Sequence, residues 1–335
     1  MEKFRDKTVL VTGACGTIGS ELVRQLVESP ATRIICLDNN ETELFYLIEK
    51  FLASGKVTGY LADIRDREAL KLRMRGTDIV LHSAALKHVV LCENSPNQAV
   101  QTNIMGTQNV IDAALENNVE RLIFTSSDKA VNPTNVMGTS KLMCERLMTA
   151  AFEAHGNSST IFASIRFGNV LGSHGSVVPL FRRQIAQGGP VTLTDKRMTR
   201  FIMTLSEATS LVLKSVWLAR GGEVIVTKMP VARIEDIAHV VRDTLSNGRD
   251  IQITEIGAKP GEKLYEELMN NEEVRRTWEY GEFFVIHSAF ADWNSPEYKH
   301  LQSLQQPDRP YNSMHELTMS RTELVKYFEE RSVLC

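Results

Sequence analysis

The sequence lacks the features that mark secreted, membrane-spanning and metal-dependent proteins. Its five cysteines are scattered without a CxxC pair, which indicates free thiols instead of disulfides or a zinc site. It has no uninterrupted apolar run of about 18 residues, and its charged beginning, MEKFRDK, differs from a signal peptide. The formal net charge is only −3, and no basic patch stands out that would bind nucleic acid. We therefore expect a cytoplasmic protein without metal, membrane or nucleic-acid partners.

The chain of 335 residues, 43% hydrophobic, is long enough for one large core with a smaller lobe. Short β-rich runs alternate with amphipathic stretches at residues 8–12, 33–38, 57–63, 78–84, 121–127 and 160–167. This alternation predicts an α/β fold with a doubly wound parallel Rossmann sheet.

The regular alternation of predicted strands and helices ends after residue 167. We expect residues 1–167 to form a cofactor-binding Rossmann domain, to which residues 200–227 return with one more helix and strand. Residues 168–199 and 228–335 contain glycine-rich loops and mixed short elements. They predict a smaller C-terminal mixed α/β lobe that binds the substrate.

A glycine-rich turn follows the first predicted strand. Gly13, Gly16 and Gly19 would let the backbone approach a pyrophosphate at the N-terminus of the next helix. Asp38 ends the second strand nineteen residues after Gly19, where its carboxylate would bind an adenosine ribose and repel a 2′-phosphate. NAD is therefore favoured over NADP. The alternative is that the glycines only form a tight turn and that Asp38 caps a helix.

Further cofactor contacts are predicted around this turn. Thr17 and Ile18 complete the turn, and Ala84 follows the fourth strand. Asp63 and Ile64 end the third strand and are candidates for contact with adenine, with the equal alternative that Asp63 caps the next helix.

Residues suited to proton transfer follow the fifth strand. Ser127, Asp128 and Lys129 end that strand, and Lys141 lies in the helix that follows. The carboxyl ends of parallel strands face the ligand crevice, so these residues predict a catalytic site. The alternative is a solvated turn and an exposed helix lysine.

Motifs along nearly the whole chain resemble one enzyme family. The stretches are TGACGTIGSEL, HSAALKHV, TNIMGTQNV, SSDKAVNPTNVMGTSK, RFGNVLGSHGSVVPLF, MTRFIMT and KPGEKLYEEL. They are similar to the NAD-dependent nucleoside-diphosphate N-acetylglucosamine 4,6-dehydratases of the extended short-chain dehydrogenase/reductase family. Family members commonly have tyrosine where this chain has Met137. That departure resembles a subgroup with membrane-anchored dehydratases of O-antigen and bacillosamine pathways, here without their membrane segment.

The resemblance implies a reaction and a role for each residue. NAD would take hydride from sugar C4, water would leave from C5 and C6, and hydride would return to C6. Lys129 would be the base at C5, because burial near a cation favours loss of its proton, and Asp128 would protonate the departing O6. Lys141 would orient the nicotinamide ribose, and Ser127 would bind O4. Since Met137 cannot ionise, Asp128, Lys129 or water would receive the O4 proton.

The resemblance also implies substrate contacts. The residues expected at the nucleotide diphosphate are Arg166, Asn169, Arg200, Lys259 and Glu262. Lys259 stands where relatives commonly have arginine, which replaces a two-pronged donor with a point charge. Lys87 and His88 would line the sugar pocket, with a purely structural role as the alternative for His88. Val177 would border the base, where an apolar contact does not distinguish uracil from guanine.

The expected reaction is dehydration of UDP-N-acetylglucosamine to a 6-deoxy-4-keto sugar for surface-glycan synthesis. GDP-N-acetylglucosamine is the alternative substrate, and the Met137 subgroup favours retention at C5 by analogy. A sugar-nucleotide 4-epimerase or 4-reductase and a non-catalytic NAD-binding sensor are the other candidates. Residues 103–117 and 138–154 predict two helices that would form the contact of a homodimer or higher homo-oligomer, or would simply pack on the sheet.

Overall fold

A nine-stranded sheet forms the centre of the computed structural model, which describes residues 1–154, 160–173, 175–257, 261–291 and 303–334. Seven neighbouring strands run parallel in the order β3-β2-β1-β4-β5-β6-β10. Their bounds are β1 (Thr8–Thr12), β2 (Arg33–Asp38), β3 (Val57–Leu61), β4 (Ile79–His82), β5 (Arg121–Thr125), β6 (Ile161–Arg166) and β10 (Val224–Thr227). The order, which runs outward from β1 in both directions, confirms the predicted doubly wound sheet.

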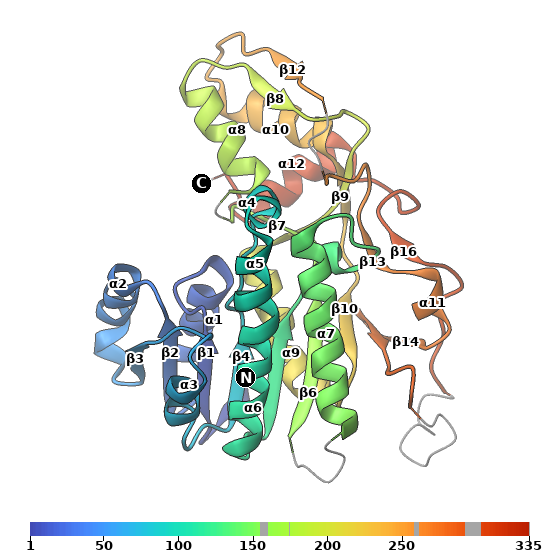
Figure 1. The fold of residues 1–335 in the computed structure, drawn as a ribbon. Helices are drawn as coiled ribbons and strands as arrows, with labels where there is room; N and C mark the ends of the chain where they lie inside the picture. Colours follow the sequence, from blue (N-terminus) through green and yellow to red (C-terminus); the bar gives the residue numbers. More distant parts are fainter. Residues whose placement is uncertain (155–159, 174, 258–260, 292–302, 335) are drawn as a thin grey trace.

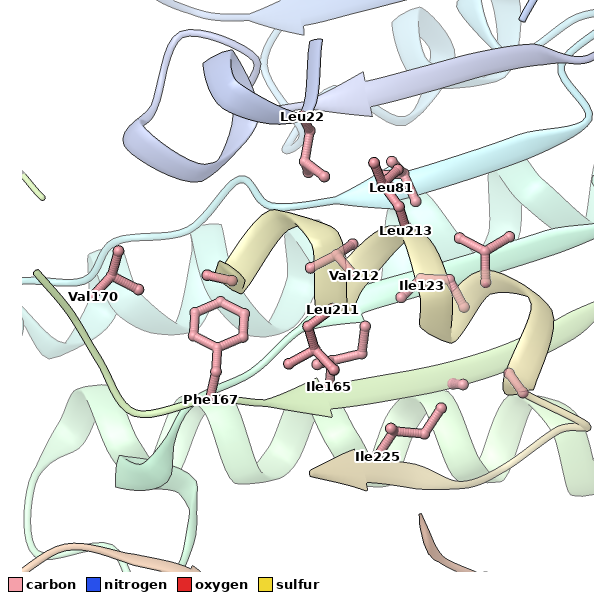
Figure 2. Close-up of a cluster of buried hydrophobic side chains, with 14 of the residues drawn as sticks. Leu22, Leu81, Ile123, Ile165, Phe167, Val170, Leu211, Val212, Leu213 and Ile225 are labelled. Atoms are coloured by element: carbon pink, nitrogen blue, oxygen red, sulfur yellow. The ribbon is translucent and has the colours of Figure 1, made fainter. Parts of the chain in front are cut away.

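Helices cover both faces of this sheet (Figure 1). They are α1 (Thr17–Val27), α2 (Glu41–Phe51), α3 (Arg67–Arg73), α6 (Gly106–Glu116), α7 (Val136–Ala154) and α9 (Leu205–Leu218). Successive strand residues point to opposite faces, so each buried strand feeds two apolar clusters. Val9 and Val11 of β1 join the cluster with α1 and α9, whereas Leu10 joins the cluster with α3, α6 and α7. Figure 2 shows Leu211 and Val212 of α9 against the sheet.

Polar residues fix where the helices begin. The side chain of Asn40 accepts a hydrogen bond from the amide of Glu43 and caps α2. Asp66 does the same for α3 through the amide of Ala69. The N-cap of α3 is therefore Asp66 and not Asp63, the alternative that the sequence offered.

The far edge of the sheet differs from the prediction. β15 (Phe283–Ile286) pairs antiparallel with β10, and β14 (Thr277–Tyr280) pairs antiparallel with β15. These residues fall in the segment that we assigned to the substrate lobe. Residues 200–204 belong to β9 (Thr199–Thr204), which pairs with β7 (Asn169–Leu171) and β11 (Val231–Arg233) in a separate sheet. The chain therefore returns to the main sheet at α9 and β10.

A smaller group of elements lies beyond the carboxyl ends of the strands, at the top of Figure 1. It consists of α8 (Val177–Ala186), β8 (Val191–Leu193), α10 (Ile234–Leu245), β12 (Ile253–Glu255) and α12 (Arg321–Glu330). These helices share a third apolar cluster built around Phe181 and Phe328.

The remaining elements are short. They are η1 (Glu2–Phe4), η2 (Leu52–Ser54), α4 (Val89–Asn94), α5 (Pro96–Ala99), the π-helix η3 (Val100–Met105), η4 (Asp128–Ala130), β13 (Glu267–Met269), α11 (Asn271–Val274) and β16 (Tyr311–Asn312). In the part of the chain that the structure describes, no helix is both long and apolar enough to span a bilayer.

Candidate active site

The glycine turn between β1 and α1 forms one wall of a cavity of about 340 Å³. Gly13 has a φ of +64°, and a Cβ built on it would lie 2.7 Å from the backbone of Ala84. A Cβ on Gly19 would lie 2.1 Å from the carbonyl oxygen of Gly13. Both positions therefore require glycine. Gly16 caps α1, and Thr17 and Ile18 form the first turn of that helix. The turn thus brings backbone and a helix N-terminus to the cavity, as a pyrophosphate site requires.

Asp38 is held rigidly at this first cavity. Its carboxylate accepts hydrogen bonds from the amides of Cys15 at 2.9 Å and Asn40 at 3.0 Å. Asp63 also lines the cavity, and its hydrogen bonds with the Arg65 side chain hold its pKa near 2. Among the described residues that line the cavity, the charged ones are all acidic. Ile64 and Ala84 lie in the same wall. A 2′-phosphate would meet carboxylates here, which agrees with the predicted preference for NAD.

A second cavity, of about 490 Å³, collects many of the predicted catalytic and substrate-binding residues. Those in its wall are His88, Lys129, Asn169, Arg200 and Glu262. Asn169 begins β7, and its buried Oδ1 atom has no hydrogen-bond partner in the described structure. A buried oxygen of this kind is costly unless a ligand supplies a donor. Lys87 is exposed just before α4.

Asp128 and Lys129 form an ion pair at the end of β5. The Asp128 carboxylate is 1% exposed and accepts hydrogen bonds from Ser127 Oγ at 2.6 Å and from Lys129 Nζ at 3.1 Å. Lys129 Nζ also lies 3.6 Å from Oε1 of Glu266. Lys129, in the wall of the second cavity, is thus within hydrogen-bonding distance of the buried carboxylate of Asp128.

The charge state of Lys129 differs from the prediction. Burial alone would lower its pKa, and Arg200 adds to that effect. The carboxylates of Asp128 and Glu266 outweigh both, so the pKa of Lys129 lies above its usual value. These surroundings therefore favour a protonated Lys129, whereas the sequence predicted a readily deprotonated one. Lys129 has to pass its proton to a neighbouring carboxylate before it can act as a base.

Lys141 and Met137 lie one turn apart on α7. Lys141 Nζ donates a hydrogen bond to the Thr125 carbonyl oxygen at 2.8 Å, and burial lowers its pKa to about 8. Met137 is 4% exposed and packs with Cys92 and Ala99 in a small apolar cluster. Residue 137 is thus part of a closed apolar contact that cannot carry a proton.

Arg166 does not lie in the second cavity, contrary to the prediction. Its guanidinium is 1% exposed and pairs with Glu145 at 2.6 Å and Glu273 at 2.8 Å. The guanidinium donates two hydrogen bonds to each of these carboxylates. It donates a fifth to the Leu268 carbonyl oxygen at 3.0 Å. All five N–H donors of the guanidinium are then used, so none remains for a diphosphate. Arg166 joins α7 and α11 to β6 instead.

The other predicted substrate residues lie in different surroundings. Arg200 reaches the second cavity, and its terminal nitrogens donate to the carbonyl oxygens of Thr199 and Lys263 at 2.8 Å and 2.9 Å. Val177 begins α8 and packs against the third apolar cluster. Lys259 lies outside the described residues.

Sequence reasoning did not identify Glu266 as a site residue. The KLYEEL segment contains two adjacent glutamates, and their neighbours do not reveal which one faces inward. β13 starts at Glu267, which pairs with Lys263 at 3.5 Å, whereas Glu266 reaches Lys129 in the second cavity. Strand alternation, which sends neighbouring side chains to opposite faces, was the available signal.

Known proteins resemble the chain over most of its length. Residues 9–288 match the family model described as polysaccharide biosynthesis protein. A Methanocaldococcus jannaschii protein named as an uncharacterized membrane protein is 49% identical over 296 residues, which are 87% of this chain and 89% of that protein. A Campylobacter jejuni protein named UDP-N-acetylglucosamine 4,6-dehydratase (inverting) is 38% identical over 285 residues, which are 84% of this chain and 83% of that one.

Two further matches bear on the site. A Rickettsia canadensis protein named UDP-glucose 4-epimerase is 36% identical over 302 residues, covering 88% of this chain and 87% of that one. The X-ray structure of Pen from Bacillus thuringiensis superposes with a TM-score of 0.91 at 39% identity, covering 98% of this chain and 99% of that one. The chain is therefore similar over most of its length to proteins whose names denote both dehydration and epimerisation.

Proposed function

This chain belongs to the family of polysaccharide biosynthesis proteins, and from that premise we propose that it dehydrates UDP-N-acetylglucosamine to UDP-2-acetamido-2,6-dideoxy-4-hexulose. The observation that carries the proposal is the ion pair between Lys129, which lines the second cavity, and the buried Asp128 behind it. Elimination of water needs one group that removes a proton and one that protonates the departing oxygen. The Campylobacter relative, which is named for this reaction, is 38% identical.

NAD is the proposed cofactor, and the first cavity fits it. Gly13 and Gly19 allow the tight packing of the turn that brings the start of α1 to this cavity, and Asp38 lies where it would accept hydrogen bonds from a ribose. Lys141 would hold the nicotinamide ribose at the other end. When bound, NAD supplies a reversible oxidation at sugar C4, which makes the neighbouring C5 proton acidic.

Lys129 in the second cavity and the residues beside it would transfer the protons of the reaction. The carboxylates around Lys129 raise its pKa, so the reaction would start with the proton of this ion pair on the lysine. A shift of this proton along the 3.1 Å hydrogen bond gives a neutral amine and a carboxylic acid. Lys129 would then remove the C5 proton, and Asp128 would protonate O6. Ser127, which already donates to Asp128, would orient O4.

We propose that the product retains its configuration at C5. Lys129 takes the C5 proton from one face of the sugar, and the same ammonium is placed to return a proton to that face. Met137, in its closed apolar cluster, offers no acid on another side. The Campylobacter relative is named as inverting, so this stereochemistry is a point at which the two proteins would differ.

The nucleotide is proposed to be UDP, because the Campylobacter relative is named for a UDP-sugar. Asn169, Arg200 and Glu262 at the second cavity would contact the nucleotide or its sugar. GDP-N-acetylglucosamine is the alternative substrate. The Rickettsia relative makes 4-epimerisation a second candidate reaction, and a sensor that binds NAD without turnover is a third.

The test is product analysis with UDP- and GDP-N-acetylglucosamine in separate incubations. We expect a product lighter by one water, formed from the UDP-sugar, with the C5 configuration read from proton coupling constants. Lys129→Met should abolish the product, whereas Lys71→Met, at a surface ion pair on α3, should not. A product of unchanged mass would favour the epimerase. Binding without any product would favour the sensor.

A homodimer is also proposed. Met105 in η3 and Met143 in α7 are large apolar side chains exposed at 53% and 45%, on the two segments predicted to form a subunit contact. Light scattering should give the mass of at least two chains. A monomer at all concentrations would exclude the dimer.

A further inference from the structure

Glu266 is a buried carboxylate that the proposed reaction has not yet used. Its side chain is 4% exposed at the wall of the second cavity. Oε1 lies 3.6 Å from Lys129 Nζ and 3.6 Å from Arg200 Nε. Oε2 has no hydrogen-bond partner in the described structure. A buried carboxylate oxygen without a donor costs free energy, which makes Glu266 a candidate for a part in the reaction.

The charged groups that face Glu266 come from several parts of the fold. They are Asp128 and Lys129 after β5, Arg200 on β9 and Lys263 in the segment before β13. Burial raises the pKa of Glu266, and Asp128 raises it further, against the opposing effect of the three cations. A carboxyl group in this environment accepts a proton more readily than an exposed glutamate.

We propose that Glu266 is the end of a proton relay, Glu266–Lys129–Asp128, which carries the proton lost from sugar O4 to the water that leaves from C6. The proposal rests on the proposed dehydration. It answers the question of where the O4 proton goes when residue 137 is a methionine. Glu266 acts through Lys129 and is therefore a positioning residue.

The relay balances the protons of the whole reaction. Oxidation at C4 releases the O4 proton, and hydroxide leaving from C6 needs one proton to become water. Lys129, as a neutral amine, takes the O4 proton and passes it to Glu266. Neutral again, Lys129 takes the C5 proton while Asp128 gives its own proton to O6.

The return steps restore the starting state. Lys129 gives a proton back to C5 after reduction at C6. The proton stored on Glu266 then passes through Lys129 to Asp128. The O4 proton has replaced the one lost in water, and no external acid or base is consumed. Lys129 can accept both the O4 proton and the C5 proton only if a neighbouring group takes the first proton from it. Glu266, whose Oε1 lies 3.6 Å from Lys129 Nζ, would be that group.

The experiment compares wild type with Glu266→Gln and with Glu267→Gln as the matched control. Glu267 is the adjacent carboxylate but pairs with Lys263 instead of Lys129. The first readout needs no substrate: acylation of Lys129 is followed against pH by peptide mass spectrometry. Removing the Glu266 charge should move the midpoint for Lys129 down by about one pH unit or more. Glu267→Gln should leave it in place. An unchanged midpoint in Glu266→Gln overturns the relay.

The second readout is turnover of UDP-N-acetylglucosamine against pH. For Glu266→Gln we expect kcat to fall by about 10- to 100-fold, with KM within about twofold and an altered pH profile. Wild-type kcat and pH profile would overturn the relay while leaving the dehydratase intact. If wild type itself forms no dehydrated product, the proposed function fails and the relay fails with it.

Glu266→Asp is a second variant that tests the relay if Glu266→Gln does not fold. It keeps a carboxyl group but withdraws it by one methylene. The Lys129 midpoint and kcat should both fall between those of wild type and Glu266→Gln. Where only Glu266→Asp folds, by circular dichroism, partial loss of kcat with a partial midpoint shift supports the relay, and wild-type values overturn it.

Discussion

Replacement of Arg166 by methionine separates a structural role from a role in substrate binding. In the structure the guanidinium lies between the carboxylates of Glu145 and Glu273, each contact is shorter than 3 Å, and every group is no more than 2% exposed. Arg166→Met leaves two buried carboxylates without their shared cation. Breaking a buried ion pair by removing one partner costs about 3–5 kcal/mol.

This cost converts into a measurable melting shift. With an entropy of unfolding of about 2.1 cal/mol/K per residue, a chain of 335 residues should melt about 4–7 °C lower. UDP affinity, measured by calorimetry well below the melting temperature, should stay within about twofold of wild type. Urea titration gives the free energy of unfolding independently.

A matched variant tests the cause. Combining Arg166→Met with Glu145→Met and Glu273→Leu removes the two charges as well, and apolar replacement of a whole buried ion group is often neutral or stabilising. The triple variant should regain most of the lost stability. A stable Arg166→Met protein with weakened UDP binding would refute this reasoning and reinstate Arg166 as a diphosphate ligand.

Three further predictions follow from the site. Lys129→Met should lower kcat by at least about 100-fold with UDP affinity unchanged, since the base is lost and not the nucleotide site; equal losses in UDP binding would contradict this. Asp38→Ala should reduce the ratio of the Kd for NADP to the Kd for NAD by at least about tenfold in binding titrations, because the carboxylate that repels the 2′-phosphate is gone. An unchanged ratio of the two Kd values would contradict the placement of Asp38 at the adenosine ribose. Burial lowers the pKa of Lys141 to about 8. As the pH rises, the native protein without cofactor therefore releases this proton before the unfolded chain does. The free energy of unfolding should then rise with pH from about 8 to about 10.4. Lys141→Met should lack that rise, and parallel pH curves for both proteins would exclude a buried titrating lysine.

The parallel sheet could be predicted because each strand is a short, almost wholly apolar run between amphipathic stretches. Such runs occur when both faces are buried, as for Val9 to Val11 in β1. The two antiparallel strands at residues 277–286 were assigned to the wrong part. Their local pattern indicates strands, but which sheet they join depends on β10, whose residues pair with positions about 60 residues later in the chain.

The cofactor turn was predictable because its chemistry is local. Gly13, at a φ of +64°, and Gly19, which packs against Gly13, must be glycine for reasons contained within the turn between β1 and α1. The charge state of Lys129 was not predictable, because it depends on Glu266, which lies 137 positions away in the chain. Arg166 was misassigned for the same reason, since its partners Glu145 and Glu273 are brought to it only by folding.

The central claim is that Lys129 and Asp128 remove water from the sugar by deprotonating C5. Its most direct test is to convert UDP-N-acetylglucosamine in deuterated water and to locate deuterium in the product by NMR and mass spectrometry. The account predicts loss of one water, one deuterium at C5 and none in the C6 methyl group, because the C5 proton passes through an exchangeable ammonium. A sugar of unchanged mass without deuterium at C5 would contradict it.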